Sequence, residues 1–241
     1  MTTLAFRATL PDPLPVPTTP FARALDAYLR DAFRASPVFA GFAGFHLVDG
    51  EWGDPSEAGR AARLAELDRH ETAFAALADA DLDAAERVDR AYLLELIAQQ
   101  RFSDRDLRDE AWDPLTVVYT LGAGFFLLLS REFAPWSHRG AAFLSRVQGV
   151  PAYLDAALAS LTGLPGRPVS LLHLDTALKQ LPGIPQLIEA GVAEARTRAE
   201  AGESPELAAP MEAAAVVATE ALDRFRVAVD TDVRVWRSLA A

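Results

Sequence analysis

The residues that could do chemistry in this sequence gather first in a loop around His46. Asp49 follows three positions later, and Gly44 and Gly50 flank the pair. A loop histidine beside a carboxylate can move a proton or hold a ligand, because loops carry function disproportionately. Aspartate and glycine are also the usual turn residues, and Asp54 just beyond is explained as a helix cap. We therefore favour a structural role and keep His46 and Asp49 as candidate ligand contacts.

A second pattern, His70-Glu71-Thr72-Ala73-Phe74, resembles half of a zinc-protease helix motif. Such a site needs imidazoles at positions i and i+4 on one helix face, with the glutamate as the base. Phe74 stands where the second imidazole would be and cannot bind a metal. We interpret the match as chance on the edge of a buried stripe. We assign no catalytic, cofactor-binding or metal-binding residue in this chain.

The composition limits the classes of partner. The 241 residues carry a formal net charge of -11, and Lys179 is the single lysine. Nucleic acids and anionic membranes are bound by clustered Lys and Arg, so neither is an expected partner. The chain has no cysteine, which excludes disulfides and thiolate chemistry. The N-terminus has no apolar signal-peptide core and is interrupted by prolines, so we expect a cytoplasmic location.

Helical spacing of apolar residues predicts an all-α protein. No two alternating runs are joined by a two-residue hairpin turn, so no strand is expected. Residues 1–17 are rich in proline and predict an extended lead-in. Residues 18–241 predict a single helical domain with internal breaks near 163–169 and 201–205, and with a last helix over about 205–239.

Two capping boxes place the helices that must position any site. Asp83-Ala84-Ala85-Glu86 opens one helix, and Asp54-Pro55-Ser56-Glu57 opens the helix before it, with Asp54 as the expected cap. The connection between these helices is short, so they should form an antiparallel hairpin. For the whole chain we predict a multi-helix antiparallel bundle-like array.

The array is expected to enclose one uncharged stretch, residues 114–130 (PLTVVYTLGAGFFLLLS). It is too short for a membrane span, which needs roughly 20 apolar residues. Gly122 and Gly124 each weaken a helix by about 1 kcal/mol relative to alanine. We therefore expect a buried segment interrupted by a glycine kink. Pro151 predicts a similar break in the next helix, expected over 135–162.

Several short motifs occur in a fixed order along the chain. They are Gly44-Phe45-His46 with Asp49, Asp54 with Ser56, residues 86–94 (ERVDRAYLL), Trp112-Asp113-Pro114-Leu115, residues 122–135 (GAGFFLLLSREFAP) and residues 147–154 (VQGVPAYL). From about residue 21 to the C-terminus, this order resembles the N-terminal half of the bacterial domain-of-unknown-function family 885. Residues 122–135 are the best match, whereas Asp113 stands where the family has asparagine.

The resemblance implies a helical protein similar to zinc metallopeptidases. Family members are typically longer, and their His-Glu-x-x-His motif lies in the C-terminal half, which this chain does not reach. No zinc ligand is therefore carried over to this chain. The resemblance implies zinc only if a C-terminal or partner half supplies it. The half that matches would supply one wall of a substrate cleft.

Three hypotheses about function follow. The first is a non-catalytic helical half of a metallopeptidase-like protein, either truncated or acting with a separately encoded zinc-bearing half. Its partner would be that catalytic half or a second copy. The second is a helical protein that binds a small molecule or peptide and has lost hydrolase activity, with Tyr119, His46 and Asp49 as polar contacts beside the central stretch. The third is an enzyme with a site around His70-Glu71.

Overall fold

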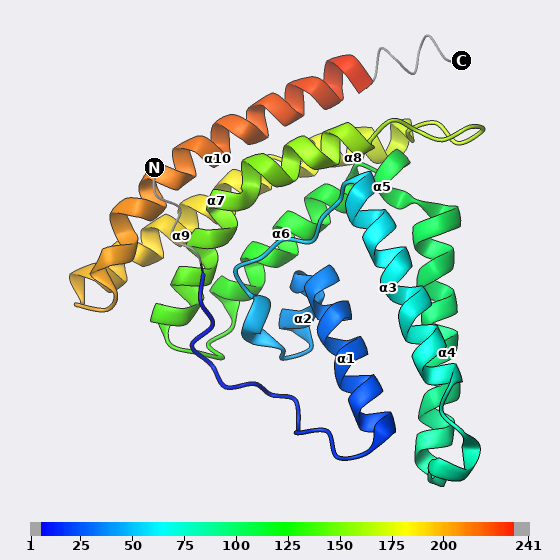
Figure 1. The fold of residues 1–241 in the computed structure, drawn as a ribbon. Coiled ribbons are helices and arrows are strands. Elements are labelled where there is room, and N and C mark those ends of the chain that lie inside the picture. The colour runs from blue at the N-terminus through cyan, green and yellow to red at the C-terminus, as the bar shows by residue number, and fades with distance from the viewer. Residues whose placement is uncertain (1–5, 234–241) are drawn as a thin grey trace.

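The computed structural model describes residues 6–233, and all regular secondary structure in this range is helical (Figure 1). This confirms the all-α prediction. Outside the helices, these residues contain one isolated bridge, between Leu164 and Arg167. Residues 1–5 of the predicted lead-in and residues 234–239 of the predicted last helix lie outside the described residues.

Ten α-helices follow one another along the described residues. They are α1 (Pro20–Ala35), α2 (Pro37–Phe42), α3 (Glu57–Ala75), α4 (Ala84–Phe102), α5 (Asp109–Trp112), α6 (Leu115–Ser130), α7 (Trp136–Ser160), α8 (Leu171–Gln180), α9 (Gly183–Glu200) and α10 (Ala208–Ala228). Shorter 3-10 turns cover His46–Val48, Asp79–Asp81 and Pro205–Leu207, and π turns cover Ser103–Leu107 and Val229–Val233.

Helix α6 lies in the middle of the array (Figure 1). It packs against α7 and α9, and α10 covers both of those helices, so that these elements share the larger hydrophobic core. Helices α1, α3 and α4 form a second, smaller core. Helix α2 touches both α1 and α6, which links the two parts. Among residues 6–233, no single helix is long and apolar enough to cross a membrane, although the bent pair Ala84–Trp112 and Leu115–Ser130 together meets that test.

The predicted hairpin of α3 and α4 is present, and both helices begin at side-chain caps. Asp83 accepts a hydrogen bond from the Glu86 backbone N–H at 2.8 Å, and Glu86 accepts in return from the Asp83 N–H. The prediction that Asp54 caps α3 is wrong. Ser56 is the cap and accepts from the Gly59 N–H at 3.1 Å. Asp54 instead accepts from the Ser56 N–H at 2.9 Å, which shapes the turn that leads into the helix.

The expected interruption at the glycines of α6 is absent. The helix runs continuously from Leu115 to Ser130. A Cβ added at Gly124 would lie 2.5 Å from Trp52 Cζ3, so this glycine allows a close approach instead of a kink. The packing of the tryptophan against the helix outweighs the weak helix propensity of glycine, which is about 1 kcal/mol worse than alanine.

Helix α6 is also less buried than its composition predicts. Leu121 and Phe125 are fully buried, whereas Tyr119 is 58% exposed and Phe126 is 57% exposed. One face therefore belongs to the core and the other meets solvent. An apolar sequence without a charge does not by itself distinguish these two faces.

The expected break at Pro151 is likewise absent, because α7 continues from Trp136 to Ser160 with the proline inside it. Proline in a helix interior costs about 3 kcal/mol or more, since it removes a backbone donor. Val147, Val150 and Leu154 on this part of the helix are buried in the larger core. The apolar area that they bury stabilises the continuous helix.

Candidate functional site

A cavity of about 390 Å³ opens between α6, α2 and the segment that leads into α3. Tyr119, singled out from the sequence, lines it together with Thr120 of the same helix. Tyr153 of α7 and Asp54 also contribute to the lining. The cavity therefore combines an apolar wall with a few polar groups, which is the usual composition of a ligand site.

Three exposed aromatic side chains line this cavity, and a fourth lies further along α6. Phe39 and Phe42 of α2 are both exposed, at 63% and 44%. They line the cavity with Tyr119, and α2 packs directly against α6, which also exposes Phe126. The Arg131 guanidinium lies 5.4 Å from the centroid of the Phe42 ring. We call Phe39, Phe42, Tyr119 and Phe126 the aromatic rim.

Tyr153 supplies a buried phenol at the inner side of the cavity. Burial raises the pKa of Tyr153 above its ordinary value, and a hydrogen bond with Thr120 opposes that rise. The phenol is therefore neutral at physiological pH and can both donate and accept hydrogen bonds. Tyr119 presents a second phenol at the outer side of the same cavity.

His46 and Asp49 lie together, but they do not line this cavity. The His46 Nδ1 is 3.0 Å from Asp49 Oδ2, and the His138 Nε2 is 3.3 Å from the same oxygen. Asp49 is completely buried, and the His46 ring stacks on Phe133 with 3.7 Å between the ring centroids. The structure thus brings together two of the three candidate contacts and separates them from Tyr119.

Electrostatic interactions explain why the Asp49 carboxylate stays ionised although it is buried. Burial raises the pKa of Asp49, but hydrogen bonds from His138 and His46 and the fields of His46 and Arg146 outweigh it and hold the pKa below its ordinary value. Arg146 is itself fully buried, and burial lowers its pKa to about 10. The Arg146 Nη1 donates to the Gly124 carbonyl of α6. Both groups are therefore ionised at neutral pH.

The buried carboxylate supports one wall of the cavity. A Cβ added at Gly41 of α2 would lie 3.2 Å from Asp49 Oδ1 and 2.6 Å from Leu127 Cδ2 of α6. Helix α2 is therefore held against both the polar cluster and α6. We call Asp49, His46, His138 and Arg146 the polar brace. Its arrangement stabilises the position of α2.

The half-motif around His70 also has a structural explanation. The His70 Nε2 is 3.0 Å from Asp31 Oδ2 of α1, which ties α3 to α1. Glu71 accepts hydrogen bonds from Arg101 of α4, and Phe74 is fully buried in the smaller core. Within residues 6–233, no group of three or more His, Asp or Glu side chains is arranged to hold a metal ion.

Comparison with known families decides where the chain belongs. The family described as "Bacterial protein of unknown function (DUF885)" matches residues 37–235. The chain belongs to the DUF885 family. No curated protein matches it. A solved structure from Shewanella oneidensis, described as that of a putative lipoprotein of unknown function, is similar at 23% sequence identity with a TM-score of 0.77.

That likeness covers 90% of this DUF885 chain but 38% of the Shewanella protein's chain. The chain thus spans about two fifths of the length of the solved relative. At this level of identity the comparison supports the shared fold. It therefore agrees with the helical array and carries no information about the chemistry of the site.

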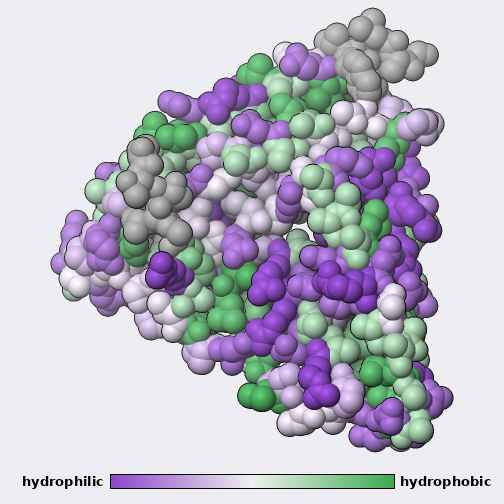
Figure 2. All heavy atoms as spheres, in the orientation of Figure 1, coloured by the Kyte–Doolittle hydropathy of each residue, from purple (hydrophilic) through white to green (hydrophobic). Residues whose placement is uncertain are grey.

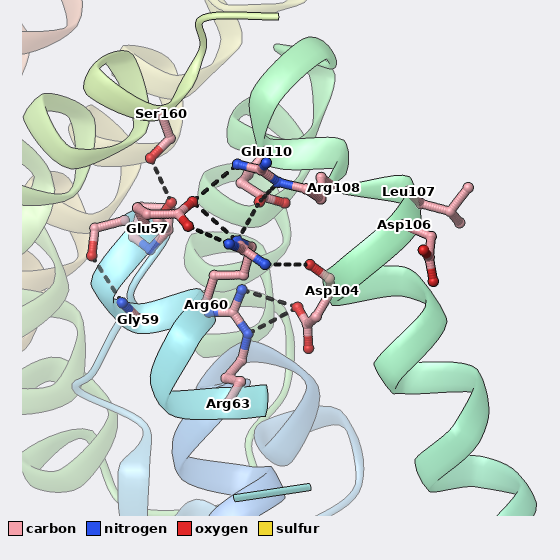
Figure 3. A network of polar contacts seen from close by, with 12 residues as sticks. Glu57, Gly59, Arg60, Arg63, Asp104, Asp106, Leu107, Arg108, Glu110 and Ser160 are labelled. Carbon is pink, nitrogen blue, oxygen red and sulfur yellow. Dashed lines mark hydrogen bonds and ion pairs between the residues drawn. The ribbon is translucent and has the colours of Figure 1, made fainter. Parts of the chain in front are cut away.

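A network of ion pairs in this DUF885 chain joins the start of α3 to the segment that follows α4 (Figure 3). It pairs arginines with carboxylates between the first turns of α3 and the segment from the π turn after α4 to the start of α5: Arg60, Arg63 and Arg108 with Glu57, Asp104 and Glu110. Arg63 Nη2 lies 3.0 Å from Asp104 Oδ1, and Arg108 Nη2 lies 3.0 Å from Glu57 Oε2. Arg108 has a φ of 50°, in the left-handed region that favours glycine.

Sequence reasoning missed the partners that hold the site. Arg146, His138, Trp52 and Tyr153 all contribute to the brace or the cavity. Arg146 is the one charged residue in the run from Gly140 to Leu154, and this signal could have revealed the buried charge. The other three are ordinary in type and spacing, and only the fold brings them to this place.

Proposed function

We propose that this chain is the non-catalytic helical half of a metallopeptidase-like protein, and that it acts with a zinc-bearing half on further sequence or on a separate chain. The metallopeptidase character rests on the ordered motifs that resemble the family pattern. The observation that carries the proposal is the aromatic rim, whose rings are exposed on two helices that are otherwise packed into the fold.

The aromatic rim has the properties of a contact surface. Aromatic residues are enriched at the centres of protein interfaces, where the few residues that dominate the binding energy each cost about 2 kcal/mol or more when truncated. Large exposed apolar patches on soluble proteins usually mark binding sites. The polar brace behind α2 keeps the surface in place before binding, which lowers the entropic cost of association.

The length relationship supports the same proposal. The match covers 38% of the solved relative's chain, so that protein contains much additional sequence. A fold that normally continues has a face against which the remainder packs. We assign that face to the aromatic rim and the cavity beside it, so that the cavity forms one wall of a cleft and the second half forms the other.

If the adjacent reading frame encodes a His-Glu-x-x-His helix, co-expression of this chain with the product of that frame tests the proposal. Size-exclusion chromatography with light scattering should show a one-to-one complex, and peptide hydrolysis should need both proteins and zinc. Exchanging Phe39 and Phe126 for serine should weaken the complex at least 10-fold without lowering the melting temperature, because both rings are exposed. Val88→Ser, at an exposed position of α4, is the control.

A clean monomer with no affinity for that neighbour would overturn the proposal, and so would a complex that the rim variants leave unchanged.

The second candidate function is binding of a short peptide or small molecule without hydrolysis. The specific observation in its favour is the cavity of about 390 Å³, in which Tyr119, Thr120 and Tyr153 interrupt an apolar wall.

A further inference from the structure

A separate cavity of about 260 Å³ lies between α1, α3 and α4, in the part of the molecule that holds the smaller core. Hydrophilic side chains gather over this side of the molecule in Figure 2. Polar side chains line it from α1 (Tyr28, Asp31), α3 (Arg63, Glu66, His70), α4 (Gln100) and the π turn that follows α4 (Asp104). Ala32, Ala35 and Leu67 supply an apolar part of the wall.

Most charges around this cavity are already paired. Asp31 contacts the Arg69 Nη2 at 2.6 Å and the His70 Nε2 at 3.0 Å. Arg63 donates to Asp104 at 3.1 Å and also to the Asp54 carbonyl at 2.8 Å. These groups satisfy one another and leave no arginine available to neutralise an anion.

Glu66 is the exception. Nothing in residues 6–233 forms a hydrogen bond or an ion pair with its side chain, although it is half-buried and lines the cavity. An ionised carboxylate only accepts hydrogen bonds. The cavity therefore presents one unpaired negative charge beside an apolar wall and the aromatic ring of Tyr28.

We propose that this cavity binds a small organic amine, with its ammonium group on Glu66 and its apolar body against Leu67 and Ala32. An anion would be repelled by the Glu66 carboxylate, and Arg63, the arginine that lines the cavity, is already paired with Asp104. A hard divalent cation needs about six oxygen ligands, and one free carboxylate does not supply them. The volume lies below the range of roughly 300–1,000 Å³ that is usual for drug-sized ligands, so the amine is small.

Titration with phenethylamine, followed by calorimetry and by ligand-observed NMR, tests the proposal. The uncharged analogue 2-phenylethanol has nearly the same shape and serves as the matched ligand. The amine should bind saturably and at least 10-fold more tightly than the alcohol, because only the amine can pair with Glu66. Glu66→Gln should remove that preference and leave the weak binding of the alcohol unchanged.

Glu220→Gln is the matched control variant, because Glu220 is exposed on α10, away from this cavity. Ala32→Leu provides a second test, since the added side chain would fill the cavity and abolish amine binding in a protein whose circular dichroism is unchanged. Absence of saturable amine binding, equal affinity for amine and alcohol, or an unchanged preference in Glu66→Gln would each overturn the proposal.

Discussion

Trp52 donates its indole N–H to the backbone carbonyl of Arg146 over 2.8 Å. The Arg146 guanidinium lies 5.1 Å from the centroid of the same indole ring, so the two residues hold each other by two different interactions. This pair fixes the segment before α3 onto α7 and places the ring against α6 at Gly124. The position of the cavity wall therefore depends on contacts between residues that are 94 positions apart.

Gly124→Ala should destabilise the protein by about 1–3 kcal/mol, the usual cost of overpacking. The added Cβ would lie 2.5 Å from Trp52 Cζ3 and 3.2 Å from Arg146 Nη1. Gly122→Ala on the same helix is the control, because its Cβ would meet Ile184 Cδ1 at an ordinary 3.6 Å. That variant should gain up to about 1 kcal/mol of helix propensity. Urea denaturation measures both, and equal effects at the two positions would contradict the close-packing role.

Asp49→Asn should lower the free energy of unfolding at pH 7 by about 3 kcal/mol, because it removes the carboxylate whose charge stabilises the buried Arg146 guanidinium. The folded-state pKa of Asp49 is lowered, so its contribution is fully present above its unfolded pKa of about 3.9. The contribution is lost as the pH falls through the folded-state value. Thermal unfolding from pH 7 to pH 2 should therefore show a smaller acid loss in the variant than in the wild type.

Asp81→Asn is the matched control for that experiment, because Asp81 is exposed in the turn between α3 and α4. It should change stability by less than about 0.5 kcal/mol. An Asp49→Asn protein with wild-type stability and the full acid loss would show that the polar brace does not hold α2 in place.

Arg108→Gly should be more stable than Arg108→Ala by about 1 kcal/mol. Both variants lose the ion pair with Glu57, which is partly exposed and contributes little. They differ in the backbone, because the φ of 50° costs an L-residue about 1–2 kcal/mol and costs glycine far less. Guanidinium denaturation compares the two. If alanine is tolerated as well as glycine, the left-handed turn before α5 is not strained.

Tyr119→Phe tests the second candidate function. If the cavity holds a short peptide, the variant should bind the probe Ala-Phe-Ala about fivefold more weakly, because it loses one hydrogen bond of about 1 kcal/mol. Tyr92→Phe, at an exposed position on α4, is the control and should leave the affinity unchanged. Fluorescence titration gives both values. An unchanged affinity in Tyr119→Phe would exclude its hydroxyl as a ligand contact.

The sequence by itself determined the helical class, the hairpin of α3 and α4, and the family. Helix caps and apolar periodicity act within a few residues, so Asp83 and Glu86 could be read directly, and both form the predicted capping box. The ordered motifs identified the family because they need no knowledge of spatial contacts. Where two local signals competed, as at Asp54 and Ser56, the sequence did not show which would cap the helix.

Only the tertiary structure decided the roles of Gly124, Pro151 and the pair His46 and Asp49. Local propensity predicts interruptions at the glycine and the proline, but packing against distant residues outweighs a local cost of a few kcal/mol. The third partner of the Asp49 cluster, His138, is 89 positions away along the chain. Spacing could not reveal that these histidines enclose a buried carboxylate, nor that Tyr119 faces a different cavity, because both depend on how the helices pack.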